Sequence, residues 1–162
     1  MNDDDVFRPR KIMSWNEYGH LESLLLSGLD FFFKENGIDG IDLVIGIYSG
    51  GIILAKSLST KLKNVPLTII KTSRTKTCQY EFFGDINLDE KETFEVSDAN
   101  VLLVDDISDS GLTFKNVLQI LENYSFNKII TATLIQKTYS AFKTDTWAKL
   151  DESKDWIVFP WE

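Results

Sequence analysis

The sequence has a single cysteine and no long hydrophobic run. Cys78 cannot form a disulfide within the chain, and no apolar stretch approaches the roughly 20 residues that a membrane-spanning helix needs. No apolar segment typical of a secretory signal follows Met1. These absences argue against a disulfide-stabilised scaffold and predict a cytoplasmic protein with no membrane partner.

Basic residues are also scarce. The chain carries 17 Lys and Arg against 25 Asp and Glu, a formal net charge of -8. Nucleic-acid binding depends on an excess of basic residues facing phosphate, so we expect no nucleic-acid partner. A small anionic substrate held by local groups is compatible with this charge. With 162 residues, 43% of them hydrophobic, the chain is expected to form a single domain over residues 1–162 with its own core.

Apolar periodicity predicts helices that alternate with short strands. Ser14 and Glu17 have capping-box spacing, and apolar residues then recur at helical intervals up to Gly37. The other predicted helices are 51–62 and 112–123, and the predicted strands are 41–48, 67–71, 101–104 and 128–136. This alternation predicts an α/β fold with a mainly parallel sheet flanked by helices. Ligands are expected beyond the carboxyl ends of its strands.

The segment VLLVDDISDSGLT, residues 101–113, joins a hydrophobic strand to a helix through three acids and small polar residues. Backbone N–H groups of a small-residue turn at a helix N-terminus can bind phosphate, which accounts for residues 109–113. Asp105 and Asp106 would repel that phosphate unless they bind sugar hydroxyls or a divalent cation. A ligand carrying phosphate, a diol and Mg²⁺ satisfies the whole segment. The alternative is that the acids only cap the helix.

This segment resembles the 5-phosphoribosyl 1-pyrophosphate (PRPP) motif of the type I phosphoribosyltransferases. The resemblance implies that Asp105 and Asp106 face Mg²⁺ and the ribose hydroxyls. It also implies that the 5-phosphate is held by Asp109, Ser110, Gly111, Leu112 and Thr113. In the 6-oxopurine branch of the family, the acid at the position of Asp109 lies near N7 of the base as the candidate general base. The family expectation for assembly is a homodimer.

A second loop follows the first long strand and opens the next helix. It consists of Tyr48, Ser49, Gly50 and Gly51. In the family this loop holds pyrophosphate on backbone amides, although a glycine pair after a strand can also be an ordinary tight turn. Relatives of the xanthine-guanine kind commonly carry Arg before the two glycines. Ser49 stands at that position here, which raises the question of how pyrophosphate would be bound.

The end of the chain resembles the purine pocket of bacterial and archaeal xanthine-guanine and hypoxanthine phosphoribosyltransferases. In that pocket a Lys donates to the 6-oxo group and an aromatic residue of a C-terminal hood stacks on the ring. The resemblance assigns base binding to Lys137, Trp156 and Ile157, within a hood region of residues 137–162. The alternatives are a solvated strand end for Lys137 and core packing for Trp156.

Residues 72–100 interrupt the helix and strand pattern. We predict a partly β lid with a possible hairpin reversal at Gly84–Asp85, because long loops in compact domains are usually functional or disordered. Arg74 and Lys76 are candidates to neutralise pyrophosphate, although two loop cations can be merely solvated. Residues 1–11 are interpreted as a loose lead-in without chemistry, whereas the aromatic tail from Lys154 is expected to dock.

The predicted activity is transfer of phosphoribosyl from PRPP to a 6-oxopurine, giving a nucleoside 5-monophosphate and pyrophosphate in purine salvage. Two alternatives are left open by the sequence. One is a regulator with this fold that binds PRPP or a nucleotide without turnover. The other is a phosphoribosyltransferase for another base, such as a pyrimidine.

Overall fold

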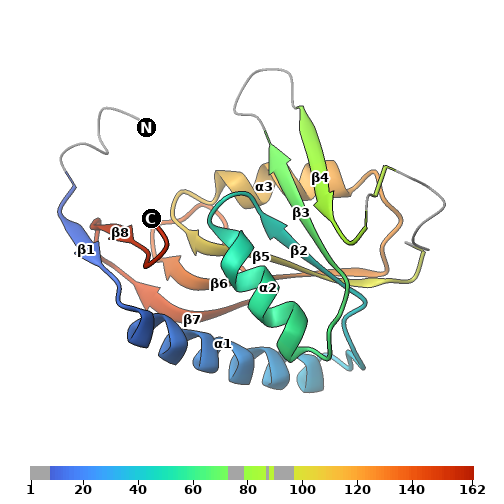
Figure 1. The fold of residues 1–162 in the computed structure, drawn as a ribbon, viewed down its shortest axis with the longest axis horizontal. Helices are drawn as coiled ribbons and strands as arrows, with labels where there is room; N and C mark the ends of the chain where they lie inside the picture. The colour runs from blue at the N-terminus through green and yellow to red at the C-terminus, as the bar shows by residue number, and fades with distance from the viewer. Residues whose placement is uncertain (1–7, 73–78, 87, 90–96) are drawn as a thin grey trace.

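The computed structural model describes residues 8–72, 79–86, 88–89 and 97–162 (Figure 1). The helices are α1 (Trp15–Glu35), α2 (Gly51–Lys61) and α3 (Leu112–Leu121). The strands are β1 (Arg10–Ile12), β2 (Leu43–Ile47), β3 (Leu67–Thr72), β4 (Tyr80–Gly84), β5 (Asn100–Ser108), β6 (Lys128–Lys137), β7 (Thr146–Asp151) and β8 (Trp156–Val158).

A six-stranded sheet in the order β4-β3-β2-β5-β6-β7 forms the centre of the molecule. All of its neighbouring pairs are parallel except β3 and β4, which are antiparallel. The helices lie on both faces of this sheet (Figure 1). The predicted α/β fold with a mainly parallel, helix-flanked sheet is therefore confirmed.

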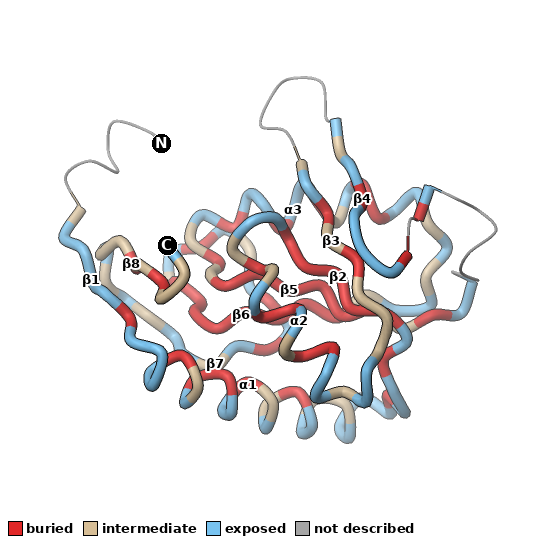
Figure 2. Tube along the Cα trace, in the orientation of Figure 1, coloured by how far each residue is buried: buried red, intermediate tan, exposed pale blue. Residues whose placement is uncertain are grey.

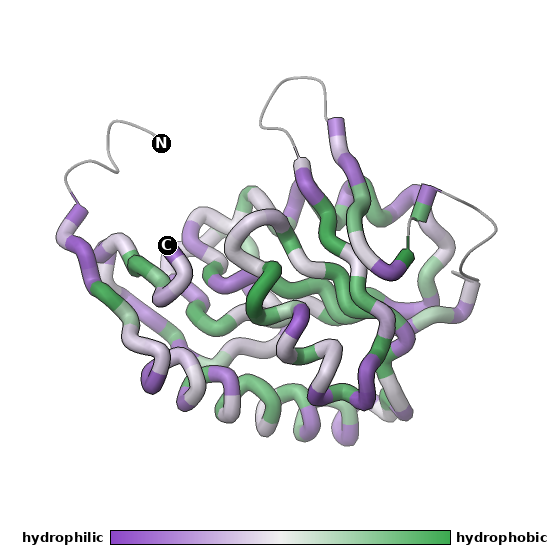
Figure 3. The backbone as a smooth tube through the Cα atoms, viewed as in Figure 1, coloured by the Kyte–Doolittle hydropathy of each residue, from purple (hydrophilic) through white to green (hydrophobic). Residues whose placement is uncertain are grey.

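The two faces of the sheet have separate hydrophobic cores. Leu25 and Leu29 of α1 and Leu54 and Leu58 of α2 pack on one face. The opposite face is covered by α3, through residues that include Phe114. The middle strands are therefore buried on both sides and strongly hydrophobic, as Figures 2 and 3 show.

Helix α1 begins as the sequence predicts. The Ser14 hydroxyl accepts a hydrogen bond from the Glu17 backbone N–H at 3.2 Å, and the Glu17 carboxylate accepts one from the Ser14 N–H at 2.8 Å. Because this reciprocal pair satisfies two otherwise unpaired N–H groups, it fixes the start of the helix.

Strand β5 is longer than its hydrophobic run. The prediction that the strand ends at Val104 is wrong, because β5 continues to Ser108. Its extension pairs with β6, with Asp105 opposite Thr133 and Ser108 opposite Gln136. The two acids therefore lie inside the strand and not after it. Hydrophobicity alone could not predict this extension, because it depends on the backbone partner that β6 supplies.

The ends of the described chain form a small sheet of their own. β1 and β8 are parallel partners, with Arg10 opposite Trp156 and Ile12 opposite Val158. The prediction of docking for the tail is confirmed. The interpretation of residues 8–11 as a loose lead-in is wrong, because β1 is paired with β8. The pairing could not be predicted from local sequence, since its partner is a distant segment. The edge strand β7 was also missed, since its residues alternate in exposure without an apolar run.

The described part of residues 72–100 contains one strand of the main sheet. Gly84 ends β4 and pairs with Thr68 of β3, so it does not form the predicted hairpin reversal. Arg74 and Lys76 lie outside the described residues. Among the described residues, no helix is long and apolar enough to cross a membrane.

Candidate active site

The glycine loop and the acid pair, which are far apart in sequence, are in direct contact. A side-chain carbon on Gly50 would collide with the Asp106 carboxylate, and one on Gly51 would lie 2.6 Å from the Val104 carbonyl oxygen. These two positions therefore require glycine because of close approach. The loop that joins β2 to α2 thus lies against Asp106.

Ser49 and Tyr48 form the exposed part of this loop, and the peptide bond between them is cis. The Lys71 ammonium near the end of β3 lies 5.1 Å from the centre of the Tyr48 ring, within the range of a cation–π contact. Lys71 therefore provides a positive charge beside the loop that carries Ser49.

Asp105 and Asp106 are buried side by side in β5, with 9% and 7% of their surfaces exposed. The Asp106 N–H donates to Asp105 Oδ1 at 3.0 Å. Burial, followed by the neighbouring Asp106 charge, raises the pKa of Asp105 well above its usual value. Burial, followed by repulsion from Glu162, raises the pKa of Asp106 to about 7. Burying two adjacent acids costs free energy unless a cation or hydrogen bonds compensate their charges. Acids with pKa values perturbed in this way are therefore candidates for a functional site.

The alternative that this acid pair caps a helix does not fit the structure. The N-cap of α3 is Gly111, where no side chain makes a capping hydrogen bond. The donor set instead suits Mg²⁺, which in proteins is usually held by one or two carboxylates together with substrate phosphates. Asp105 and Asp106 provide two such carboxylates at one position.

The loop from Asp109 to Thr113 is open to solvent on one side and supported on the other. Ser110, Leu112 and Thr113 are exposed, whereas Gly111 is buried with a left-handed φ of 81°. A side-chain carbon on Gly111 would lie 2.5 Å from the Phe142 backbone nitrogen. Glycine is thus required both by its φ and by the chain packed against it.

The segment after β6 provides that support. The Ala141 N–H donates to the Ser110 carbonyl at 3.0 Å, and the Ser108 and Ser140 hydroxyls lie 3.0 Å apart. The loop therefore has a fixed path, with exposed small residues at the start of a ten-residue helix. That arrangement is suited to an anion, because N–H groups at a helix N-terminus lack intrahelical partners.

Both carboxylate oxygens of Asp109 have partners from other elements. The Tyr139 hydroxyl donates to Oδ1 at 2.6 Å, and Arg8 Nη1 donates to Oδ2 at 2.9 Å. Burial and then the hydrogen bond to Asp109 raise the pKa of Tyr139 above its usual value. Asp109 is consequently held in one orientation at the rim of the loop.

Lys137 is buried and not a solvated strand end, with 1% of its surface exposed. Its ammonium donates to Asp151 Oδ2 at 2.7 Å, to the Ser153 carbonyl at 2.8 Å and to the Asp155 carbonyl at 3.0 Å. An ammonium has three N–H donors, which these three acceptors satisfy, and Ser153 Oγ is a fourth, more distant acceptor at 3.5 Å. Lys137 therefore ties the end of β6 to the turn that precedes Trp156.

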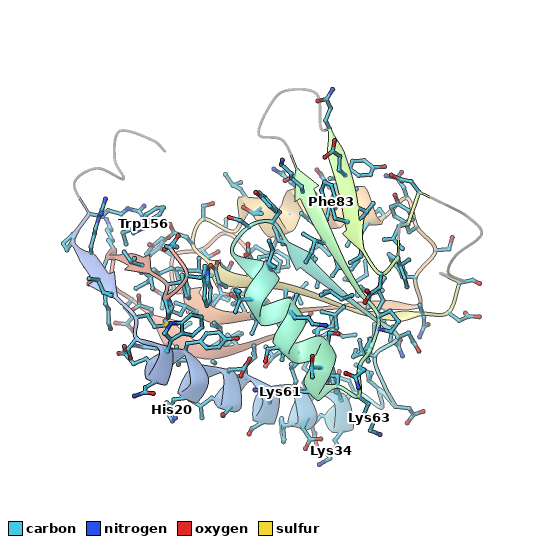
Figure 4. The ribbon with its side chains drawn as sticks, viewed as in Figure 1. His20, Lys34, Lys61, Lys63, Phe83 and Trp156 are labelled. Carbon is cyan, nitrogen blue, oxygen red and sulfur yellow. The ribbon has the colours of Figure 1, made fainter. Side chains whose placement is uncertain are left out.

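Trp156 and Ile157 point to different surroundings. Ile157 is buried in the core beside α1, whereas Trp156 is half-buried. The Trp156 N–H donates to the Pro9 carbonyl at 2.8 Å, which fixes the backbone on β1. Figure 4 shows Trp156 at the β1–β8 end of the molecule, away from Lys34 and Lys63. In Figure 1, β6 and β7 point toward this end.

The structure thus gathers most of the predicted residues at one edge of the sheet. Tyr139 connects two groups of them, because its hydroxyl binds Asp109 and its ring centre lies 6.0 Å from the Lys137 ammonium. Trp156 follows Asp155, whose carbonyl accepts from Lys137. Ile157 does not join this edge through its side chain.

A cavity of about 310 Å³ lies elsewhere, between α1, the end of β7 and the β1–β8 pair. It is lined by residues that include His20, Leu24, Ala148 and Ile157. The predicted phosphate and acid residues do not line it. We place the candidate active site at the carboxyl edge of the sheet and not in this cavity, because the charged and anion-binding groups converge at that edge.

The chain matches the model of the phosphoribosyl transferase domain family over residues 15–162 and belongs to that family. Purine phosphoribosyltransferase from Pyrococcus horikoshii is 25% identical, with a TM-score of 0.72 and 94% of each chain covered. Comparison with curated proteins gives no match.

Two further solved structures share the fold. Xanthine-guanine-hypoxanthine phosphoribosyltransferase from Helicobacter pylori is 22% identical, with a TM-score of 0.69 and coverage of 94% of this chain and 93% of that chain. Orotate phosphoribosyltransferase from Aeropyrum pernix is 19% identical, with a TM-score of 0.58 and coverage of 79% and 64%.

Sequence reasoning missed three residues near the site, namely Arg8, Lys71 and Tyr139. Arg8 lies in a segment without an apolar pattern, and its position depends on the pairing of β1 with β8. Tyr139 follows Lys137 by two residues, so its closeness to the end of β6 is visible in the sequence. Its contact with Asp109 is not, because the two are 30 positions apart.

Proposed function

We propose that the protein is a purine phosphoribosyltransferase that transfers the 5-phosphoribosyl group of PRPP to a 6-oxopurine. One observation carries the proposal: the acid pair in β5, the loop that begins at Asp109 and the end of β6 at Lys137 lie at one edge of the sheet, where Tyr139 contacts both Asp109 and Lys137. The family membership supports the transfer reaction. The purine specificity of two similar enzymes supports the choice of base.

Each group at this edge has a role in binding PRPP. The N–H groups of residues 110–113 hold the 5-phosphate, for which the Leu112 N–H exchanges its bond to the Ser110 hydroxyl. The loop at residues 48–51 holds pyrophosphate, with Lys71 as a nearby cation. Asp105 and Asp106 hold Mg²⁺ and the ribose hydroxyls. When bound, Mg²⁺ neutralises charge on the departing pyrophosphate.

Asp109 is the candidate general base. In this role one carboxylate oxygen takes the proton from N7 of the base as the new bond to the sugar forms. Arg8 and Tyr139 each donate to one of these oxygens in the structure, and each oxygen keeps a second lone pair that can accept the proton. The distance between the base and Asp109 then sets the efficiency of the transfer.

Lys137 and Trp156 form the proposed base pocket. Trp156 stacks on the purine, and Lys137 donates to the 6-oxo group in exchange for the Ser153 or Asp155 carbonyl. Adenine presents an amino donor at that position, which an ammonium cannot accept. Adenine is therefore a poor substrate in this proposal.

A panel of bases tests the proposal. Pyrophosphate release from PRPP and Mg²⁺ is measured with guanine, xanthine, hypoxanthine, adenine, orotate and uracil. We expect at least one 6-oxopurine to exceed adenine by about 10-fold or more, the difference that one charge-assisted hydrogen bond provides. Highest activity with orotate would instead favour the second candidate, which the orotate enzyme among the similar structures supports.

Replacement of Trp156 by Ala tests the stacking role. We expect nucleotide binding to weaken by about 5- to 150-fold, because stacking of a base on an aromatic side chain is worth ~1 to 3 kcal/mol. PRPP has no base and should bind nearly as to the wild type. Titration of both ligands measures the difference.

Trp161 provides a control for that experiment. It packs against Trp15, Tyr18 and Phe159 and belongs to the aromatic cluster at α1. Trp161→Ala is therefore expected to lower thermal stability without a selective loss of nucleotide. If Trp156→Ala behaves in the same way and also weakens PRPP, Trp156 is a packing residue and the pocket is misplaced.

A further inference from the structure

The segment that runs from the acid pair of β5 through the proposed phosphate loop has acids but no basic residue of its own. Residues 105–113 include Asp105, Asp106 and Asp109, and none of the nine is Lys or Arg. Backbone N–H groups can bind a phosphate there, yet the dianion would lie beside three carboxylates. Mg²⁺ on Asp105 and Asp106 would offset two of these charges, and a cation from another part of the chain would offset the charge of Asp109 beside the phosphate.

Arg8 is a cation that the fold brings to this loop. Its Nη1 lies 2.9 Å from Asp109 Oδ2, although the two residues are 101 positions apart. Asp109 is the first residue of the loop, and the exposed Ser110 follows it directly. The guanidinium is thus within a few ångströms of the place where the N–H groups would hold phosphate.

The position of Arg8 is fixed by the β1–β8 sheet. The Trp156 N–H donates to the Pro9 carbonyl at 2.8 Å, and the Met13 N–H donates to the Val158 carbonyl at 2.9 Å. These two bonds flank the paired residues of β1, one just before Arg10 and the other just after Ile12. The backbone next to Arg8 is therefore anchored to the hood region that carries the proposed base pocket.

Stability alone is a weak explanation for this contact. The side chains of Arg8 and Asp109 are 25% and 31% exposed. Partly exposed ion pairs of this kind contribute little to folding, because water and salt screen them and two side chains lose freedom. A guanidinium beside an anion site can instead bind phosphate strongly, because its planar N–H donors match the geometry of the phosphate oxygens.

We propose that Arg8 is a phosphate-binding residue of this site. Its guanidinium contacts the 5-phosphate of the sugar, while residues 110–113 bind the same phosphate through their N–H groups. This inference rests on the proposed function. In the free protein the guanidinium pairs with Asp109. When a phosphate monoester occupies the loop, Arg8 contacts the phosphate in place of Asp109.

Ribose 5-phosphate is the probe, because it carries the phosphate and the ribose hydroxyls but neither pyrophosphate nor base. Its affinity is measured by calorimetry for the wild type, Arg8→Ala and Arg8→Lys. We expect Arg8→Ala to weaken binding about 10-fold or more, as for loss of a charge-assisted hydrogen bond. Arg8→Lys should recover part of the loss, because it keeps the charge without the planar fork.

Arg10→Ala is the matched control. Arg10 is the exposed first residue of β1, two positions after Arg8, so its loss removes the same charge from the same end of the chain. We expect its affinity for ribose 5-phosphate to stay within about 2-fold of the wild type, since a distant exposed charge is screened by salt. Its melting temperature shows how far any change in β1 affects the fold.

The outcomes separate the two proposals. Unchanged or tighter binding by Arg8→Ala, with normal binding by the wild type, would overturn the role of Arg8 and leave the proposed function standing. Equal losses in Arg8→Ala and Arg10→Ala would also overturn it, as a general charge effect. A wild type that does not bind ribose 5-phosphate would contradict the phosphate loop, and both proposals would fail.

Discussion

Asp106→Asn is expected to lower turnover at least ~10-fold and to leave the folded protein as stable as the wild type or more so. Asn keeps the shape of the side chain but removes the charge that would hold Mg²⁺. The stability gain has a separate origin. Asp106 is 7% exposed, and its burial opposes ionisation, so the wild type loses stability when this carboxylate ionises.

The sign of the pH dependence follows from the raised pKa. Asp106 has a pKa of about 7 in the folded protein against an ordinary value near 4, so the folded state holds its proton more tightly. The contribution of Asp106 to stability is then largest below pH 4, falls as the pH rises toward 7, and levels off above it. At pH 8 this difference between the folded and the ordinary pKa of Asp106 lowers the free energy of unfolding by on the order of a few kcal/mol.

Thermal melting in the presence of EDTA at pH 5 and pH 8, alongside turnover with Mg²⁺, tests this expectation. Asp106→Asn should gain most at pH 8. Asp39→Asn is the control, because Asp39 is exposed and far along the chain from the site. If Asp106→Asn loses stability and activity together, the acid pair supports the fold and our assignment of a metal-binding role is wrong.

Lys137→Met is expected to destabilise the protein strongly and to reduce its preference for 6-oxopurines over adenine by up to ~100-fold. Met keeps the unbranched stem but leaves Asp151, whose side chain is 14% exposed, without its cation. Removal of one partner of a buried ion pair typically costs ~3 to 5 kcal/mol.

The Lys137–Asp151 pair also predicts acid sensitivity. Burial alone would raise the pKa of Asp151, but the Lys137 ammonium and Ser153 hold it below its usual value. The pair therefore contributes stability above the unfolded pKa, which is lost as the pH falls through the folded pKa. Lys137→Met should show a smaller loss of stability between neutral and acidic pH than the wild type.

The base preference decides which role Lys137 has. The ratio of kcat/KM for hypoxanthine to that for adenine is compared between Lys137→Met and Asp151→Asn, both measured well below their melting temperatures. Asp151→Asn weakens the contact between Lys137 and Asp151 but keeps the Lys137 ammonium. The ratio of kcat/KM for hypoxanthine to that for adenine should therefore change less in Asp151→Asn than in Lys137→Met. An equal ratio in the wild type and Lys137→Met would make Lys137 a positioning residue of the hood region and not a reader of the base.

The sequence allowed the central part of the fold to be predicted because its signals are local. The capping box at Ser14, the apolar run of β2 and the glycines before α2 each lie within a few residues. Local patterns specify strands and helices, and their alternation implies a parallel sheet. The acid pair could also be recognised, because Asp105 and Asp106 are adjacent.

The parts that were missed depend on pairing between distant segments. β1 contains only three exposed residues and exists as a strand because β8 is its partner. The extension of β5 past Val104 likewise depends on β6. Asp109 could be singled out from its loop, but its contacts with Arg8 and Tyr139 could not, because they come from elements 101 and 30 positions away.

The most direct test of the proposed reaction is its stoichiometry. The protein is incubated with PRPP, Mg²⁺ and hypoxanthine, guanine or xanthine, and both products are quantified in the same sample. We predict equal amounts of nucleoside 5-monophosphate and pyrophosphate, and neither product when the base is omitted. Pyrophosphate without nucleotide, or binding of PRPP without either product, would contradict phosphoribosyl transfer to a purine.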